Sequence, residues 1–145
     1  AGYIADGTRV YSLGSLSKEL TDAHAFILDL NAWIEEQLRP DAIPGDIYTR
    51  ILERVGKSPY ASKFMGAGEN QVKFVAHSVG LELDELPVIA PKYDVPFEVN
   101  TVMAVEPKIF FPGIGGVGTE NTYVIRAGPP ERLTTCAQEI YVVNP

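Results

Sequence analysis

The sequence predicts an α+β domain in which helices cover one face of a mostly antiparallel sheet. Apolar residues recur at helical spacing only in the first part of the chain, up to Gly56. The later part consists of short β-like segments separated by Gly and Pro, a pattern typical of this fold class. The 145 residues, 46% of them apolar, suffice for one domain with a buried core.

The first expected elements are a strand and a long helix. Residues 2–13 mix aromatic and β-branched residues with polar ones, and Gly14 ends them, which is typical of an extended segment. Over residues 18–39 the apolar side chains recur every three or four positions until Pro40 stops the pattern. This spacing predicts an amphipathic helix.

A second helix is expected after a short loop. The Pro-Gly-Asp segment 44–46 supplies the loop and an N-cap at Asp46, and Gly56 ends the helix. Residues 56–70 are rich in Gly, Ser, Pro and Asn and show little periodicity. They predict a loop that leads toward His77.

The rest of the chain predicts strands. Residues 72–75, 101–111 and 118–126 are rich in β-branched and aromatic residues, and residues 139–143 add a further β segment. Prolines punctuate residues 87–96, which we therefore expect to be a loop.

Residues 113–118, Gly-Ile-Gly-Gly-Val-Gly, match the G-x-G-x-x-G pattern of dinucleotide-binding proteins. That pattern binds a pyrophosphate only where a helix begins directly after the glycines. Here Thr119 opens a strand-like segment, so the pattern predicts a glycine-rich hairpin turn instead.

Charge and composition exclude several classes of function. Twelve basic and 19 acidic residues give a net charge of −7, and no basic cluster is available for phosphates, so we expect no nucleic-acid partner. The longest apolar runs fall short of the roughly 20 residues of a membrane span, so we expect no membrane insertion. The single cysteine, Cys136, cannot form an intramolecular disulfide, and we expect a cytoplasmic protein.

Nothing in the sequence marks a nucleophilic side chain. Cys136 is expected to be structural, and His24 is expected to be a solvated residue of the long helix. His77 and Ser78 are adjacent and would point to opposite faces of an extended segment. A serine hydrolase is therefore not expected.

Hard metal ligands are spread along the β-rich part of the chain. Glu106 and Glu120 lie among apolar or small strand residues, where a lone buried charge is costly and a carboxylate needs a partner, often a cation. One histidine with several carboxylates suits Mn, Fe(II), Co or Zn. The candidate ligands are Asp6, His77, Glu82, Asp84, Glu85, Glu106 and Glu120.

Several stretches, in order along the chain, resemble the pita-bread metallopeptidases. They are Gly2–Tyr11, Phe74–Pro91, Val102–Pro107, Gly116–Thr122 and Gly128–Thr134. The family includes Xaa-Pro dipeptidases (prolidases), Xaa-Pro aminopeptidases, methionine aminopeptidases and the creatinase group. The resemblance implies a partial pita-bread fold, with helices packed on a curved, mostly antiparallel sheet. Because the chain has no initiator Met and the family's first metal aspartate would precede Asp6, we expect residues 1–145 to be the C-terminal portion of the catalytic domain.

The resemblance also implies roles for four residues. Asp6 would bridge two metal ions, His77 would bind one of them, and Glu120 would bridge again. Glu106 would bind the same ion as His77, near the attacking water, and act as general base. The implied cofactors are divalent ions (Mn, Co, Zn or Fe), two in the parent protein and one or none in this fragment.

Two substitutions depart from the family pattern. Asp84 stands seven residues after His77, where the family has a histidine that contacts the substrate carbonyl, so Asp84 occupies a catalytic position. An ionised aspartate cannot donate a hydrogen bond to an oxyanion unless its pKa is raised. The second departure is Gly118, which stands where prolidase-like members often carry an arginine. Both departures concern the substrate side of the site.

The function implied by the resemblance is a metal-dependent exopeptidase of the Xaa-Pro dipeptidase or aminopeptidase type. It would hydrolyse a peptide bond near the free N-terminus of a short peptide or dipeptide through a metal-activated water. This fragment alone is expected to be inactive. The alternatives are a creatinase-like amidohydrolase, which cleaves a C–N bond of a non-peptide amide, and a non-catalytic pita-bread scaffold. The family is commonly dimeric, so the resemblance allows a homodimer, but the sequence does not decide the oligomeric state.

Overall fold

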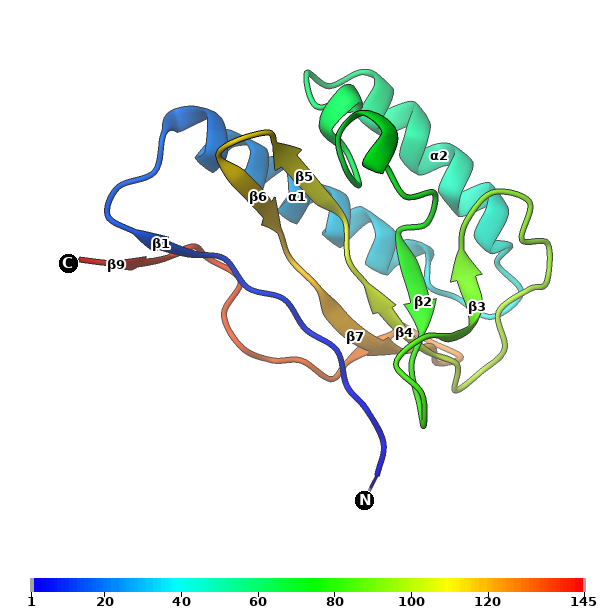
Figure 1. The fold of residues 1–145 in the computed structure, drawn as a ribbon. Helices are drawn as coiled ribbons and strands as arrows, with labels where there is room; N and C mark the ends of the chain where they lie inside the picture. Colours follow the sequence, from blue (N-terminus) through cyan, green and yellow to red (C-terminus); the bar gives the residue numbers. More distant parts are fainter. Residues whose placement is uncertain (1, 145) are drawn as a thin grey trace.

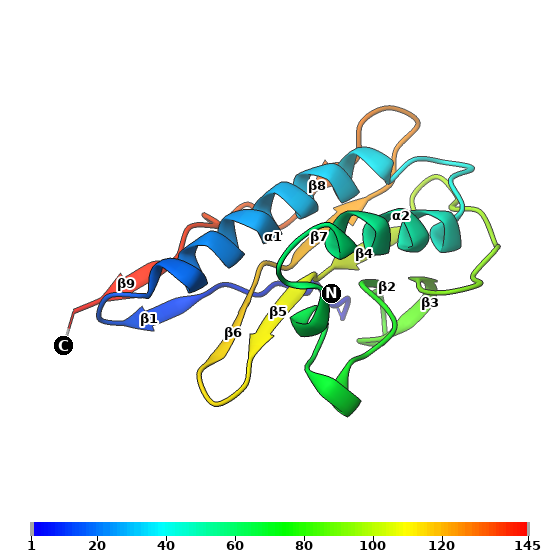
Figure 2. The same cartoon turned by 90° about the horizontal axis from the view of Figure 1, so that it is seen from above.

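Two helices lie side by side across one face of a five-stranded sheet in the computed structural model, which describes residues 2–144 (Figures 1 and 2). The strand order is β3-β2-β4-β7-β8, and every neighbouring pair is antiparallel. The strands are β2 Ala76–Ser78, β3 Glu85–Ile89, β4 Val102–Val105, β7 Asn121–Val124 and β8 Glu131–Arg132. The predicted α+β class is confirmed; the predicted 1–145 domain includes Ala1 and Pro145, which lie outside the described residues.

A hairpin extends the middle of this sheet. Its strands are β5 Lys108–Phe111 and β6 Gly115–Gly118. The hairpin continues the β4–β7 ladder in the same register, because Val105 pairs with Asn121 before the break and Lys108 pairs with Gly118 after it. The break therefore consists of two residues on each strand.

The turn of this hairpin is the glycine-rich segment. Gly113 has a φ of 75° and Gly115 a φ of 151°, backbone conformations that side chains disfavour. The predicted hairpin turn is confirmed, and no helix follows the glycines.

The helices are α1, Lys18–Gln37, and α2, Pro44–Gly56. Ser17 caps α1, since its side chain accepts a hydrogen bond from the backbone N–H of Leu20 at 3.4 Å. The prediction of a loop at 44–46 with Asp46 as N-cap is wrong. Pro44 is already helical and Ile43 is the N-cap, because the fixed φ of proline suits the first helical position. The predicted loop over residues 56–70 holds two short 3₁₀ turns, Ala61–Lys63 and Gly68–Asn70.

The two ends of the described chain pair with each other. β1, Tyr11–Leu13, runs parallel to β9, Tyr141–Val143, and the rings of Tyr11 and Tyr141 stack with centroids 4.9 Å apart. The strand predicted over residues 2–13 is therefore confirmed only at its end. Residues 2–10 lie outside any strand, although Thr8 exchanges backbone hydrogen bonds with Glu120.

Two other predictions about strands are wrong in position or kind. The strand expected at 72–75 lies at Ala76–Ser78, so His77 is its central residue. The first three residues of the loop expected over 87–96, Pro87 among them, belong instead to strand β3. Proline is tolerated there because β3 is an edge strand.

The core lies between the helices and the sheet. Ile27, Ile34 and Ile51 of the helices are fully buried, as are Ile89 and Met103 of the sheet. Among the described residues, no helix is long and apolar enough to cross a membrane.

Candidate metal centre

Glu106 and Glu120 stand opposite each other at the break between the sheet and its hairpin. Glu106 follows β4 and Glu120 precedes β7, and the register is the same on both sides of the break, so the two glutamates occupy equivalent positions in it. Their backbone N–H groups donate to the oxygens of Val75 and Thr8 rather than to each other. Both are buried. Like charges directly opposite each other destabilise a sheet, so this arrangement requires a compensating cation or proton.

His77 faces Glu106 from the neighbouring strand β2. Its Nδ1 atom lies 3.1 Å from the backbone oxygen of Ser78, and a carbonyl can only accept, so the proton sits on Nδ1. In the neutral ring this arrangement leaves the lone pair on Nε2, which lies 3.6 Å from Glu106 Oε1. Ser78 donates its hydroxyl to the oxygen of Val102 at 2.8 Å and forms no catalytic pair with His77.

Asp6 reaches the same place from the N-terminal segment. Its backbone N–H donates to Thr122 Oγ1 at 2.9 Å, and that hydroxyl donates back to the Asp6 oxygen at 2.6 Å. Two residues on, Thr8 donates its hydroxyl to Glu120 Oε2 at 2.6 Å. The segment is therefore fastened to β7 by side chains although it is not a strand.

Arg9 completes this attachment. Its guanidinium donates to the Glu120 oxygen at 2.7 Å, to Asn121 Oδ1 at 2.9 Å and to the Ala137 oxygen at 2.7 Å. It also donates to the oxygen of Cys136, whose own side chain is exposed. The expectation that Cys136 is a structural residue is wrong for its thiol, which packs into no core.

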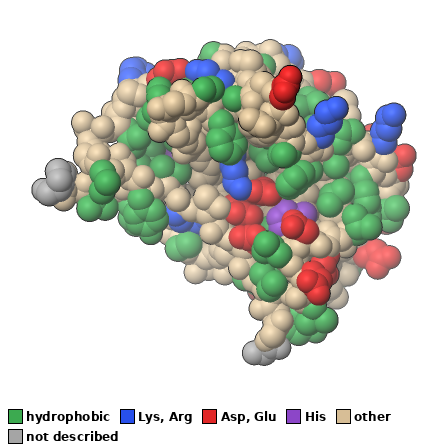
Figure 3. Space-filling view, viewed as in Figure 1, with side chains coloured by type: hydrophobic (Ala, Val, Ile, Leu, Met, Phe, Trp, Pro, Cys, Tyr) green, Lys and Arg blue, Asp and Glu red, His purple; other side chains and the backbone are tan. Residues whose placement is uncertain are grey.

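Asp6, His77 and Glu120 each offer one ligand atom, and these atoms all lie within 4.8 Å of one another. Glu106 lies outside this triad but contacts its histidine. Figure 3 shows acidic side chains gathered around a histidine near the middle of this face, with a basic side chain beside them. Imidazole and carboxylates at this spacing fit a divalent transition metal.

The charge state of Glu120 reflects this crowding. Burial is the main cause that raises the pKa of Glu120, and the charges of Glu106 and Asp6 raise it further. The hydrogen bond from Thr8 and the charge of Lys108 act in the opposite direction on that pKa. A cation bound between these groups would relieve the same repulsion.

Lys108, which pairs with Glu106, is not among the residues that the sequence indicated. The ammonium contacts Glu106 Oε2, and the lysine side chain keeps 28% of its surface exposed. An alternating strand places residues 106 and 108 on one face, and this spacing could have indicated the pair.

On the opposite side of the sheet, Asn31 and His24 of α1 form a polar cluster with Thr119, a residue of the break. Asn31 of α1 is buried and donates through Nδ2 to the oxygen of Thr119 at 2.6 Å. His24 Nε2 lies 3.5 Å from Thr119 Oγ1. The expectation that His24 is solvated is wrong, since it is buried and this burial lowers its pKa. Only the tertiary fold reveals this cluster, because both residues follow the helical pattern of α1.

The remaining candidate acids lie at the rim or outside the centre. Asp84 is 73% exposed, and its Oδ1 atom is 3.5 Å from His77 Nδ1. Glu85 accepts a hydrogen bond from the backbone N–H of Glu82 at 2.8 Å, which stabilises a surface turn. Glu82 and Glu85 therefore do not join the centre.

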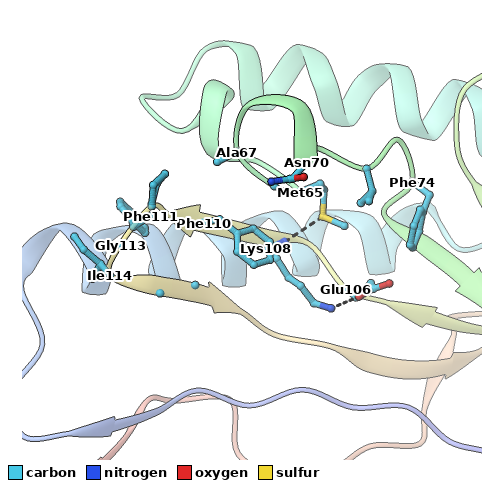
Figure 4. Close-up of a pocket in the computed structure, with 15 residues that line it drawn as sticks. Met65, Ala67, Asn70, Phe74, Glu106, Lys108, Phe110, Phe111, Gly113 and Ile114 are labelled. Carbon is cyan, nitrogen blue, oxygen red and sulfur yellow. Dashed lines mark hydrogen bonds and ion pairs between the residues drawn. The ribbon is translucent and has the colours of Figure 1, made fainter.

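A pocket of about 830 Å³ opens beside Glu106 and Lys108 (Figure 4). Its walls are largely apolar and include Phe74, Phe110 and Ile114, whereas Asn70 adds an amide. The pocket joins the acidic centre at the Glu106–Lys108 pair. An apolar group bound in the pocket would lie next to the ligand cluster.

Comparison with protein families gives one match, to the family model described as metallopeptidase family M24, over residues 1–127. Among curated proteins, the Xaa-Pro dipeptidase of Pyrococcus furiosus is 26% identical over 95% of this chain, which covers 38% of that protein.

Solved structures give the same picture. The X-Pro aminopeptidase of Thermotoga maritima MSB8 superposes with a TM-score of 0.87 at 29% identity, over 98% of this chain and 38% of that one. A dipeptidase of Pyrococcus horikoshii OT3 superposes with a TM-score of 0.86 at 28% identity, again over 98% and 38%. The chain thus spans less than two fifths of the length of these relatives.

Proposed function

The chain belongs to metallopeptidase family M24, and from that premise we propose that it carries most of the metal centre of an Xaa-Pro exopeptidase. The partial pita-bread fold implied by the sequence resemblance is confirmed by its structural neighbours. The observation that carries the proposal is the convergence of Asp6, His77 and Glu120 on one point.

The ligand set that we propose is Asp6, His77, Glu106 and Glu120. Asp6 and Glu120 offer carboxylates able to bridge two ions, whereas His77 offers Nε2 beside Glu106. Mn, Co, Zn or Fe would suit these donors. A divalent ion held there supplies Lewis acidity and makes water nucleophilic near neutral pH.

Glu106 and Asp84 have different proposed roles. Glu106 borders the pocket, and its carboxylate would take the proton from the attacking water and return it to the leaving amine. Asp84 lies at the rim beside His77 Nδ1, where its carboxylate would help hold that N–H and leave Nε2 free for metal. An exposed Asp84 can also meet a substrate at the rim.

The proposed substrate is a short peptide or dipeptide with proline after the scissile bond, as in the names of the relatives. We expect the 145-residue chain alone not to turn it over, because it spans 38% of those relatives. Glycine at position 118 keeps a creatinase-like amidohydrolase as the second candidate. We propose a cytoplasmic protein, for which a homodimer is one assembly that the family resemblance allows.

Titration of the metal-stripped chain with Mn(II) by calorimetry tests the centre before any substrate is chosen. We expect saturable binding that is lost in His77→Ala and kept in Glu53→Gln, an exposed residue of α2. Unfolding curves of each variant verify that it is folded. Absence of binding in the wild-type chain would refute the ligand set.

Activity separates the two candidate enzymes. A panel of Xaa-Pro dipeptides and small non-peptide amides, assayed with Mn(II), is expected to show hydrolysis of the dipeptides by a protein that carries this centre at full family length. Hydrolysis of the amides alone would favour the creatinase-like alternative.

A further inference from the structure

Lys108 is built into the centre by its neighbour across the hairpin. Lys108 and Gly118 form a cross-strand pair. A Cβ at position 118 would lie 2.6 Å from Lys108 Cγ and 3.1 Å from the oxygen of Pro107. Glycine at position 118 therefore leaves space for the lysine side chain. Figure 4 shows that side chain extending from β5 to Glu106.

The ammonium occupies one side of the Glu106 carboxylate. Lys108 contacts Oε2, while Oε1 faces His77 Nε2 at 3.6 Å. Among residues 2–144, no other lysine or arginine side chain forms an ion pair with Asp6, Glu106 or Glu120. Lys108 is thus the cation that offsets the acidic cluster.

We infer that Lys108 is a tethered counter-cation that competes with a metal ion for the Glu106 carboxylate. The inference rests on the proposed metal centre. A metal ion and an ammonium compete for the same carboxylate, and each also repels the other. The lysine thereby stabilises the metal-free fold and weakens metal binding.

The structure provides room for the displaced ammonium. Lys108 lines the 830 Å³ pocket beside Glu106, so its side chain can turn into that space without leaving the hairpin. Lys63 also packs against β5 but contacts none of the proposed metal ligands. It pairs with Glu19 at 2.9 Å, and its ammonium lies 4.2 Å from the ring centre of Phe111. Lys63 is therefore a matched control.

The test compares Lys108→Met with Lys63→Met in Mn(II) calorimetry and in thermal unfolding of the metal-free chain. For Lys108→Met we expect about tenfold tighter binding or more, the effect of removing one close charge pair. The melting temperature of the metal-free Lys108→Met chain should fall. Lys63→Met should leave the Mn(II) affinity unchanged.

A second variant keeps the charge and moves the side chain. Gly118→Ala places a methyl group against Lys108 Cγ, so it should push the lysine from Glu106 and also tighten Mn(II) binding. It tests the inference if Lys108→Met fails to fold.

Two results would overturn the inference in different ways. Unchanged or weaker Mn(II) affinity in Lys108→Met, with measurable binding in the wild type, would refute the exchange and leave the proposed centre intact. No Mn(II) binding in any variant would refute the proposed centre and the exchange with it.

Discussion

Thr119 and Glu120 are neighbours in the chain, yet they serve opposite faces of the sheet. Thr119 meets α1 through Asn31 and His24, in a region of close apolar packing. Glu120 meets Asp6, Glu106 and His77, where like charges gather. Packing on the α1 face stabilises the fold. On the acidic face, the repulsion between like charges lowers the free energy of unfolding.

The difference between the faces suggests that they should respond oppositely to truncation. Side chains on the α1 face should be costly to remove whatever the metal content. An acid on the other face should be costly to keep while no metal is bound.

The largest expected effect lies in the core under α1. Ile34→Ala removes a fully buried side chain between α1 and the sheet, and should lower the free energy of unfolding by about 2–5 kcal/mol. Urea denaturation measures it. Leu52→Ala, on the exposed side of α2, is the control and should cost far less. The Mn(II) affinity of the folded Ile34→Ala chain should not change, and a change would mean that the faces are coupled through the core.

An intermediate loss of stability is expected for Asn31, which lies on the α1 face and donates to the residue next to Glu120. Asn31→Ala removes the hydrogen bond to the Thr119 oxygen and leaves that buried oxygen without its partner, at a cost of about 1–3 kcal/mol. The Asn31 Oδ1 atom has no partner among the described residues, which reduces the loss. Because Thr119 precedes Glu120, Mn(II) affinity should also fall. Unfolding and calorimetry of one sample distinguish this variant from Ile34→Ala.

The α1 face was largely predictable from the sequence and the acidic face was not. The periodicity that ends at Pro40 places Ile27 and Ile34 on the same side of the helix, because residues seven positions apart are two helical turns apart. An amphipathic helix turns its apolar side toward the core. The same periodicity could not show that His24 is buried, since its environment comes from Thr119, 95 positions along the chain.

Part of the centre could be anticipated from local chemistry. Acids among apolar strand residues indicated Glu106 and Glu120, and the resemblance added Asp6 and His77. Their geometry required the hairpin register, which depends on a turn at Gly113 that sequence spacing locates only approximately. Lys108 was missed because a lysine in a strand usually means a solvated residue, and only Gly118 opposite it gives the side chain its path.

The smallest expected effect is also the most diagnostic, because replacing Glu120 should stabilise the metal-free chain, whereas the two preceding variants destabilise it. Burial and the charges of Glu106 and Asp6 raise the pKa of Glu120, so its protonated form is favoured by folding. The stability linked to this group is therefore present at low pH and lost as pH rises through the raised pKa.

Glu120→Gln imitates the neutral acid, and at neutral pH it should stabilise the metal-free chain by up to about 1 kcal/mol, the scale of one cross-strand like-charge pair. The gain should vanish near pH 4, where wild-type Glu120 is protonated. Melting curves from pH 4 to pH 8, with Glu53→Gln of α2 as an exposed control, measure the difference. Destabilisation at pH 7 would show that the Glu120 carboxylate already has sufficient partners without a metal, and that the two faces do not differ as their charges suggest.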